Sequence, residues 1–116
     1  MIDVNNLAVT PGSINPGNAK RITFTWDGDV NKLTETPVEI KMSIEDGADV
    51  SFLDINDNLV KAVYWQTDFD INTTQFTEVL FLKNTAPTFT GNRALITITA
   101  TNASGKSASN SCTILF

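Results

Sequence analysis

The sequence predicts an all-β protein, a two-layer antiparallel β-sandwich of seven to nine short strands with Greek-key connections, in a single domain over residues 1–116. Apolar residues alternate with polar ones in several short runs, which is the period of a half-buried strand. Gly, Pro, Asn and Asp gather between those runs, where turns are needed. The longest pattern, residues 94–116, alternates, turns at 102–107 and alternates again to the end. Such a hairpin has one apolar face, which a second sheet must cover.

The expected strands follow one another closely along the chain. In order they are residues 7–9, 20–26, 38–45, 50–55, 59–65, 75–82, 94–101 and 108–116. Asp27-Gly28-Asp29 is expected to end the second strand, and a polar connection closed by Pro37 follows it. Residues 50–55 and 59–65 are expected to pair as a hairpin across a turn at Asp57-Asn58. Helix should be nearly absent.

Alternation also predicts which side chains form the core. The expected core residues are Ile22, Phe24, Trp26, Ile40, Ile96, Ile98, Cys112 and Ile114. Cys112 is the one cysteine of the chain, so it has no intrachain partner, and we interpret it as a small buried hydrophobe. Residues 75–82 are apolar on both faces, which is typical of a central strand or of one that faces a partner.

Two stretches resemble a known superfamily. The run Ala100-Thr-Asn102-Ala-Ser-Gly105-Lys-Ser107 is similar to the corner between the last two strands of immunoglobulin-like and fibronectin type III domains. Ile22-Thr-Phe24-Thr-Trp26 resembles their second strand, which ends in a buried tryptophan. Bacterial and phage surface proteins carry modules with the same pattern. The resemblance implies an immunoglobulin-like sandwich, and the long interval from Trp26 to Asn102 implies an added hairpin or long loops.

Composition excludes several classes of partner. With 8 basic and 13 acidic side chains the formal net charge is −5, which argues against a nucleic-acid backbone as ligand. No apolar run approaches the roughly 18 residues that a membrane span needs. The first residues, from Met1 to Asn6, have neither a basic nor an apolar signal region, so we expect synthesis in a cytoplasm without secretion.

The sequence has few of the side chains that commonly act in catalysis. Histidine is absent, which removes the commonest general base, the usual Ser and Cys triads and most zinc sites. We therefore expect no enzyme, no catalytic residue and no bound cofactor. Asp54, Asn56 and Asp57 are the residues that would hold calcium, but their spacing does not match a calcium-binding loop, and Asx residues are also ordinary turn formers.

Three residues are the candidate contacts with a ligand or partner: Tyr64, Trp65 and Phe116. Phe116 ends the last strand, which is either packed against its own sheet or offered to a neighbour as an added strand. We expect a structural module of a phage virion, such as a capsid decoration, head or tail fibre protein, which binds a capsid or tail lattice or a second copy of itself. The alternative is a carbohydrate- or cell-surface-binding module of a larger secreted bacterial protein, acting outside the cell through Tyr64 or Trp65.

Overall fold

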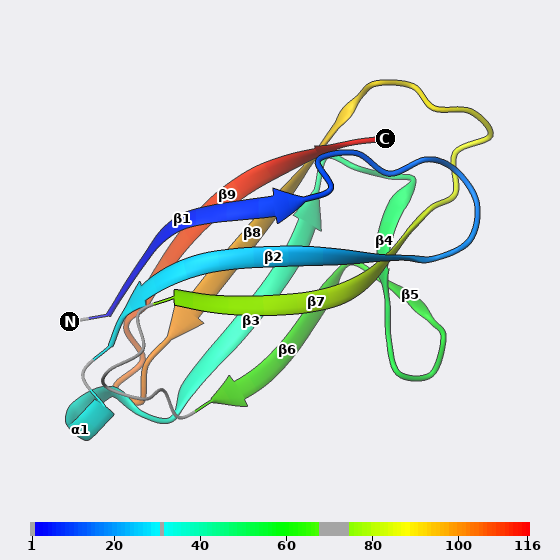
Figure 1. The fold of residues 1–116 in the computed structure, drawn as a ribbon. Helices are drawn as coiled ribbons and strands as arrows, with labels where there is room; N and C mark the ends of the chain where they lie inside the picture. The colour runs from blue at the N-terminus through cyan, green and yellow to red at the C-terminus, as the bar shows by residue number, and fades with distance from the viewer. Residues whose placement is uncertain (1, 31, 68–74) are drawn as a thin grey trace.

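Nine strands form two antiparallel sheets that face each other in a computed structural model describing residues 2–30, 32–67 and 75–116 (Figure 1). The elements are β1 (Asp3–Thr10), β2 (Lys20–Asp29), the short helix α1 (Lys32–Glu35), β3 (Val38–Glu45), β4 (Val50–Leu53), β5 (Leu59–Val60), β6 (Ala62–Thr67), β7 (Gln75–Asn84), β8 (Arg93–Thr101) and β9 (Ser107–Leu115). One sheet has the order β1-β2-β7-β4-β5 and the other β6-β3-β8-β9. The predicted all-β sandwich is confirmed.

The chain changes sheet at every connection except β1–β2, β4–β5 and β8–β9. Most strands that follow one another in the sequence lie in opposite sheets. The chain therefore crosses between the two sheets several times. At one side of the sandwich β1 lies beside β9 (Figure 1), and the segment after β1 forms a parallel bridge between Ser13 and Leu115. This bridge ties the beginning of the chain to its end.

The core fills the space between the sheets, as the alternation predicts. Its side chains with essentially no exposure include Ile22, Phe24, Trp26, Ile40, Ile96, Ile98 and Ile114. Cys112 is the exception among the predicted core residues, because it is only partly buried and packs against the edge of the core. Burial still raises the pKa of its thiol from 9.0 to about 11, so little thiolate is present at neutral pH.

The β8–β9 hairpin forms as predicted, with an unbroken register from Arg93 opposite Leu115 to Thr101 opposite Ser107. Gly105 takes a φ of 87° in the connecting turn, a conformation that glycine adopts without strain. The buried Asn102 organises this turn. Its Oδ1 accepts hydrogen bonds from the backbone N–H groups of Ser104 and Lys106, and its Nδ2 donates to Glu35 at 3.3 Å.

The first two strands are longer than the alternation predicts. β1 contains a bulge at Asn6, whose φ is 56°, so that Val4 and Leu7 both face the core although they are three residues apart. A search for a period of two therefore misses its first half. The prediction that Asp27-Gly28-Asp29 ends β2 is wrong, because these residues pair with β1, and Gly28 is buried beside the ring of Trp26.

The predicted hairpin between residues 50–55 and 59–65 is only partly formed. β5 pairs with β4 over two residues, and the chain then crosses to the other sheet, where β6 pairs with β3. Lys61 sits at this crossing. Its backbone oxygen accepts a hydrogen bond from Ile44 N at 2.8 Å, and its ammonium donates to the carbonyl oxygens of Gly47 at 2.8 Å, of Ala48 at 3.1 Å and of Val50.

Replacement of Lys61 by methionine is expected to lower the free energy of unfolding by about 1–3 kcal/mol, because it removes charged donors from carbonyl groups that are partly shielded from water. Urea denaturation followed by circular dichroism measures this change. Lys41→Met is the control, since the Lys41 ammonium lies over the ring of the exposed Tyr64, and we expect it to stay within about 0.5 kcal/mol of wild type. Equal midpoints for the two variants would contradict the structural role of Lys61.

Candidate interaction surface

The three residues predicted as contacts lie in different environments. Tyr64 is 59% exposed on the outer face of β6, with the Lys41 ammonium 5.8 Å from the centre of its ring. Trp65 points to the other side of the same strand and packs, partly buried, against the core. Phe116 is buried. The structure therefore does not bring these three side chains together.

Phe116 is held within its own molecule rather than offered to a neighbour. Its N–H donates to Asn92 O at 2.9 Å, and its carbonyl oxygen accepts from Thr90 N at 3.0 Å and Gly91 N at 2.7 Å. The prediction that the last residue is a partner contact is corrected in favour of its alternative, a strand end packed against its own sheet. The side chain of Phe116 packs in the core, and its backbone hydrogen bonds hold the end of the chain against residues 90–92.

The residues named for calcium serve the turn between β4 and β5. Asp54 Oδ1 accepts hydrogen bonds from Asn56 N at 2.9 Å and from Asn58 N at 2.8 Å, which is the usual use of an aspartate in a tight turn. Within the described part of the chain, no group of three or more His, Cys, Asp or Glu side chains gathers as metal ligands. Asp68 and Asp70, a further closely spaced acidic pair, lie outside the described residues.

The two sheets present very different outer faces. β8 and β9 carry a ladder of hydroxyl groups on the four-stranded sheet, in which Thr97 Oγ1 lies 2.9 Å from Ser111 Oγ and Thr101 Oγ1 lies 2.7 Å from Ser107 Oγ. These hydroxyls are hydrogen-bonded to one another across the strands and offer no apolar contact. The five-stranded sheet instead exposes large apolar side chains.

We name this second region the outer apolar surface and define it by five residues: Leu53, Ile55, Leu59, Val79 and Phe81. Leu53 and Leu59 are partners in the β4–β5 register. Val79 and Phe81 project from β7, are 45% and 46% exposed, and face the same side because they are two residues apart. Leu59 is 47% exposed, and Ile55, in the turn after β4, is 97% exposed. Single exposed apolar residues are ordinary, whereas larger groups of them are typical of interaction sites.

A shallow hollow of 460 Å³ lies within this surface. It is lined by Ala19, Leu53, Asp54, Ile55, Asp57 and Phe81. Apolar side chains make most of its lining and two carboxylates from the β4–β5 turn stand beside them. The hollow is thus suited to an apolar side chain of a partner, with polar contacts available at the rim.

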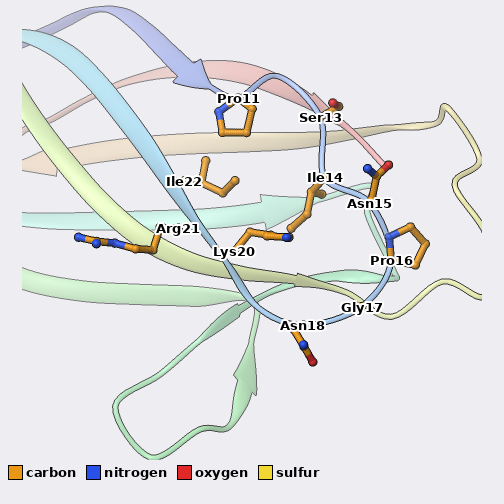
Figure 2. A pocket seen from close by; sticks show the side chains of 10 residues that line it. All are labelled: Pro11, Ser13, Ile14, Asn15, Pro16, Gly17, Asn18, Lys20, Arg21 and Ile22. Atoms are coloured by element: carbon orange, nitrogen blue, oxygen red, sulfur yellow. The ribbon is translucent and has the colours of Figure 1, made fainter.

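A larger hollow of 670 Å³ lies under the loop between β1 and β2 (Figure 2). The loop is fixed in place, because Ile14 is buried, Asn84 Nδ2 donates to Ile14 O at 3.0 Å, and Gly17 N donates to Asn84 O at 3.3 Å. Figure 2 shows the Lys20 side chain extending toward Ile14 while Arg21 points away. We interpret this hollow as space beneath an anchored loop that closes the end of the sandwich.

Part of the outer apolar surface could be anticipated from sequence. The apolar residues on both faces of residues 75–82 predict a central strand or one that faces a partner. β7 is a central strand between β2 and β4, and Val79 and Phe81 are exposed on its outer face. The contributions of Ile55 and Leu59 could not be anticipated, because both residues were expected inside a longer hairpin. The only feature of the sequence that indicated their exposure was that the apolar runs on either side of the turn are short.

Comparisons with known proteins identify similar folds but no family. No protein-family model matches the sequence, and no curated protein matches it. The fold is similar to that of a conjugative transposon lipoprotein from Bacteroides eggerthii, at 9% sequence identity and a TM-score of 0.56, over 97% of this chain and 95% of that one. Weaker likenesses are to the bacterial hydrophobin BslA, at 17% identity and a TM-score of 0.43 over 98% of both chains, and to the sporulation control protein Spo0M from Bacillus subtilis, at 12% identity and 0.45 over 98% of this chain and 48% of that one. At such identities the likeness concerns the fold alone.

Proposed function

We propose that the protein is a non-catalytic interaction module that acts by assembly, binding a protein partner through the outer apolar surface. The observation that carries the proposal is the exposure of Ile55, Leu59, Val79 and Phe81 on one face of the five-stranded sheet. Water contact with these side chains is unfavourable by about 25 cal/mol for each Å² that a partner could cover. The hydroxyl ladder of the opposite face offers no comparable gain.

The setting that we propose is a phage virion, with the protein as a capsid decoration, head or tail fibre component. Supporting this is a strand arrangement like that of immunoglobulin-like domains, in which the first, second and fifth strands share one sheet and the third, sixth and seventh share the other. β1, β2 and β7 on one side and β3, β8 and β9 on the other follow that division. The partner is then a capsid or tail lattice, or a second copy of this chain.

A second candidate function is carbohydrate binding at a cell surface, and the exposure of Tyr64 favours it. An exposed aromatic ring can stack on a sugar. Trp65 faces the other way, so it adds nothing to such a platform, and the Lys41 ammonium already lies near the ring. Titration with a soluble oligosaccharide, followed by isothermal titration calorimetry and repeated with Tyr64→Ala, tests this function separately.

Co-sedimentation with purified phage capsids or tails tests the assembly function. We expect the wild-type protein to pellet with the particles and the double variant Ile55→Ser, Phe81→Ser to remain in the supernatant, with at least about tenfold weaker binding for the loss of two buried apolar contacts. Phe89→Ser is a matched control, because Phe89 is as exposed as Phe81, at 45%, but lies in the β7–β8 connection. A monomer that ignores every particle and binds an oligosaccharide through Tyr64 would overturn the proposal.

A further inference from the structure

The strand β7 is longer than the strand beside it. β4 pairs with β7 only at the register positions Leu82, Lys83 and Asn84. Between Gln75 and Phe81, no strand of the described part of the chain pairs with β7 on the side away from β2. That stretch therefore presents a free strand edge, with its backbone N–H and C=O groups open to pairing.

Two hydrogen bonds show which backbone N–H and C=O groups of β7 point toward this edge. Thr85 N donates to Asp49 O at 2.8 Å on the β4 side of the strand, and Asn84 O accepts from Gly17 N at 3.3 Å on the β2 side. Because the backbone groups of successive residues in a strand point to alternate sides, the groups of Thr77 and Val79 point to the free edge. Those of Glu78 point to β2 and already serve the ladder.

Two other edges of the sandwich are blocked, those of β1 and β9. The β1 edge is interrupted by the bulge at Asn6. Bulges of this kind disturb the regular edge of a strand and so hinder the addition of another strand. At the β9 edge, Asn110 Oδ1 accepts from Ser111 N at 2.8 Å and Asn110 Nδ2 donates to Val4 O at 3.3 Å. Leu115 N is bonded to Gly12 O at 2.9 Å. The β7 edge carries neither device.

Glu78 gives the free edge its chemical character. It lies opposite Phe24 in the β2–β7 register, so its side chain points inward, and it is half-buried between Phe76 and Leu80 on the same face. It forms no hydrogen bond or ion pair with the residues that the structure describes, and burial raises the pKa of its carboxyl. Among the residues that the structure describes, this carboxylate has no cationic partner. The inward-facing residues of the β6 edge, Val63 and Trp65, carry no charge.

We propose that the β7 edge from Gln75 to Phe81 accepts an extended strand of a partner protein that carries a basic side chain opposite Glu78, flanked two residues away on each side by apolar side chains. Backbone hydrogen bonds to Thr77 and Val79 supply the affinity, and the cation facing Glu78 supplies the selection. The apolar neighbours of the cation cover Phe76 and Leu80. The edge shares Val79 and Phe81 with the outer apolar surface, but it uses the backbone groups of β7 and the inward-facing side chains of Phe76, Glu78 and Leu80. The inference therefore does not depend on a partner bound to the outward-facing side chains.

The probe is a blocked seven-residue peptide that alternates threonine and valine around a central lysine, compared with the same peptide with a central glutamate. Each is titrated to millimolar concentration into the ¹⁵N-labelled protein, and amide resonances are followed by NMR. We expect the amide protons of Thr77 and Val79 to move downfield as they gain hydrogen bonds. The lysine peptide is expected to bind about tenfold more tightly than the glutamate peptide.

Four variants make the test specific. Thr77→Pro removes an edge N–H without breaking the β2–β7 ladder, so it should abolish binding, whereas its control Thr77→Val should bind as wild type does. Glu78→Lys should reverse the preference so that the glutamate peptide binds better, which keeps the test decisive even if the proline variant folds poorly. Ile55→Ser should leave peptide binding within about twofold, since Ile55 lies in the turn after β4 and outside β7.

Absence of binding at millimolar peptide, unchanged binding by folded Thr77→Pro, or shifts confined to other strands would each overturn the inference. Sedimentation of the protein alone covers a further outcome. A dimer that Thr77→Pro abolishes would assign the edge to a second copy of this chain and would overturn the basic partner strand. Weaker particle binding by Ile55→Ser, with peptide binding intact, would show that the two binding modes are separate.

Discussion

Deletion of Thr113–Phe116 is expected to abolish cooperative unfolding of the protein. It removes the fully buried Ile114 and the buried Phe116, and the loss of each such side chain costs about 2–5 kcal/mol. It also removes the Leu115 backbone groups that bond to Gly12 O at 2.9 Å and Ile14 N at 2.8 Å and so anchor the loop between β1 and β2. Together these losses approach the whole stability of a typical domain, about 5–15 kcal/mol.

Circular dichroism during heating and the dispersion of the NMR spectrum measure the outcome. The control is Thr113→Ala, which changes an exposed side chain of the same strand and should stay within about 0.5 kcal/mol of wild type. A truncated protein that still melts cooperatively within a few degrees of wild type would show that the end of β9 is dispensable for folding. In that case the strand end would be free to serve a partner.

Trp26→Ala is expected to lower the free energy of unfolding by about 3–5 kcal/mol. The Trp26 side chain is fully buried between the sheets, and its ring centroid lies 4.6 Å from that of Phe76 at an angle of 31°. A Cβ atom added at Gly28 would lie 2.6 Å from Cζ3 of this ring, so the indole occupies the space that a larger residue 28 would need. Removal of the indole therefore opens a cavity that rigid strands cannot close.

The neighbouring glycine supplies a sharper test of this packing. Gly28→Ala alone should cost about 1–3 kcal/mol by overpacking, and the cost should nearly vanish in the Trp26→Ala background. Urea denaturation of the four proteins in this cycle, followed by circular dichroism, measures the coupling. Additive effects, or a Trp26→Ala protein as stable as wild type, would show that the indole does not fill the space beside Gly28.

The sequence alone determined the layers of this protein. Strict alternation over residues 38–45 and 94–101 places Ile40, Ile96 and Ile98 on one face, and these side chains are fully buried. The period of two is a property of the extended backbone itself, so local pattern suffices to identify the strands and their inner faces. The same reasoning predicted that residues 75–82 have apolar side chains on both faces.

Only the tertiary structure decided where strands end and what covers them. β2 continues through Gly28 because β1 pairs with it, and the chain leaves β5 for the other sheet where Lys61 binds the carbonyl groups of the β3–β4 turn. Both events depend on contacts between segments distant in sequence. The outer apolar surface and the free edge of β7 arise in the same way. β4 reaches β7 only as far as Leu82, and no local pattern encodes where one strand stops beside another.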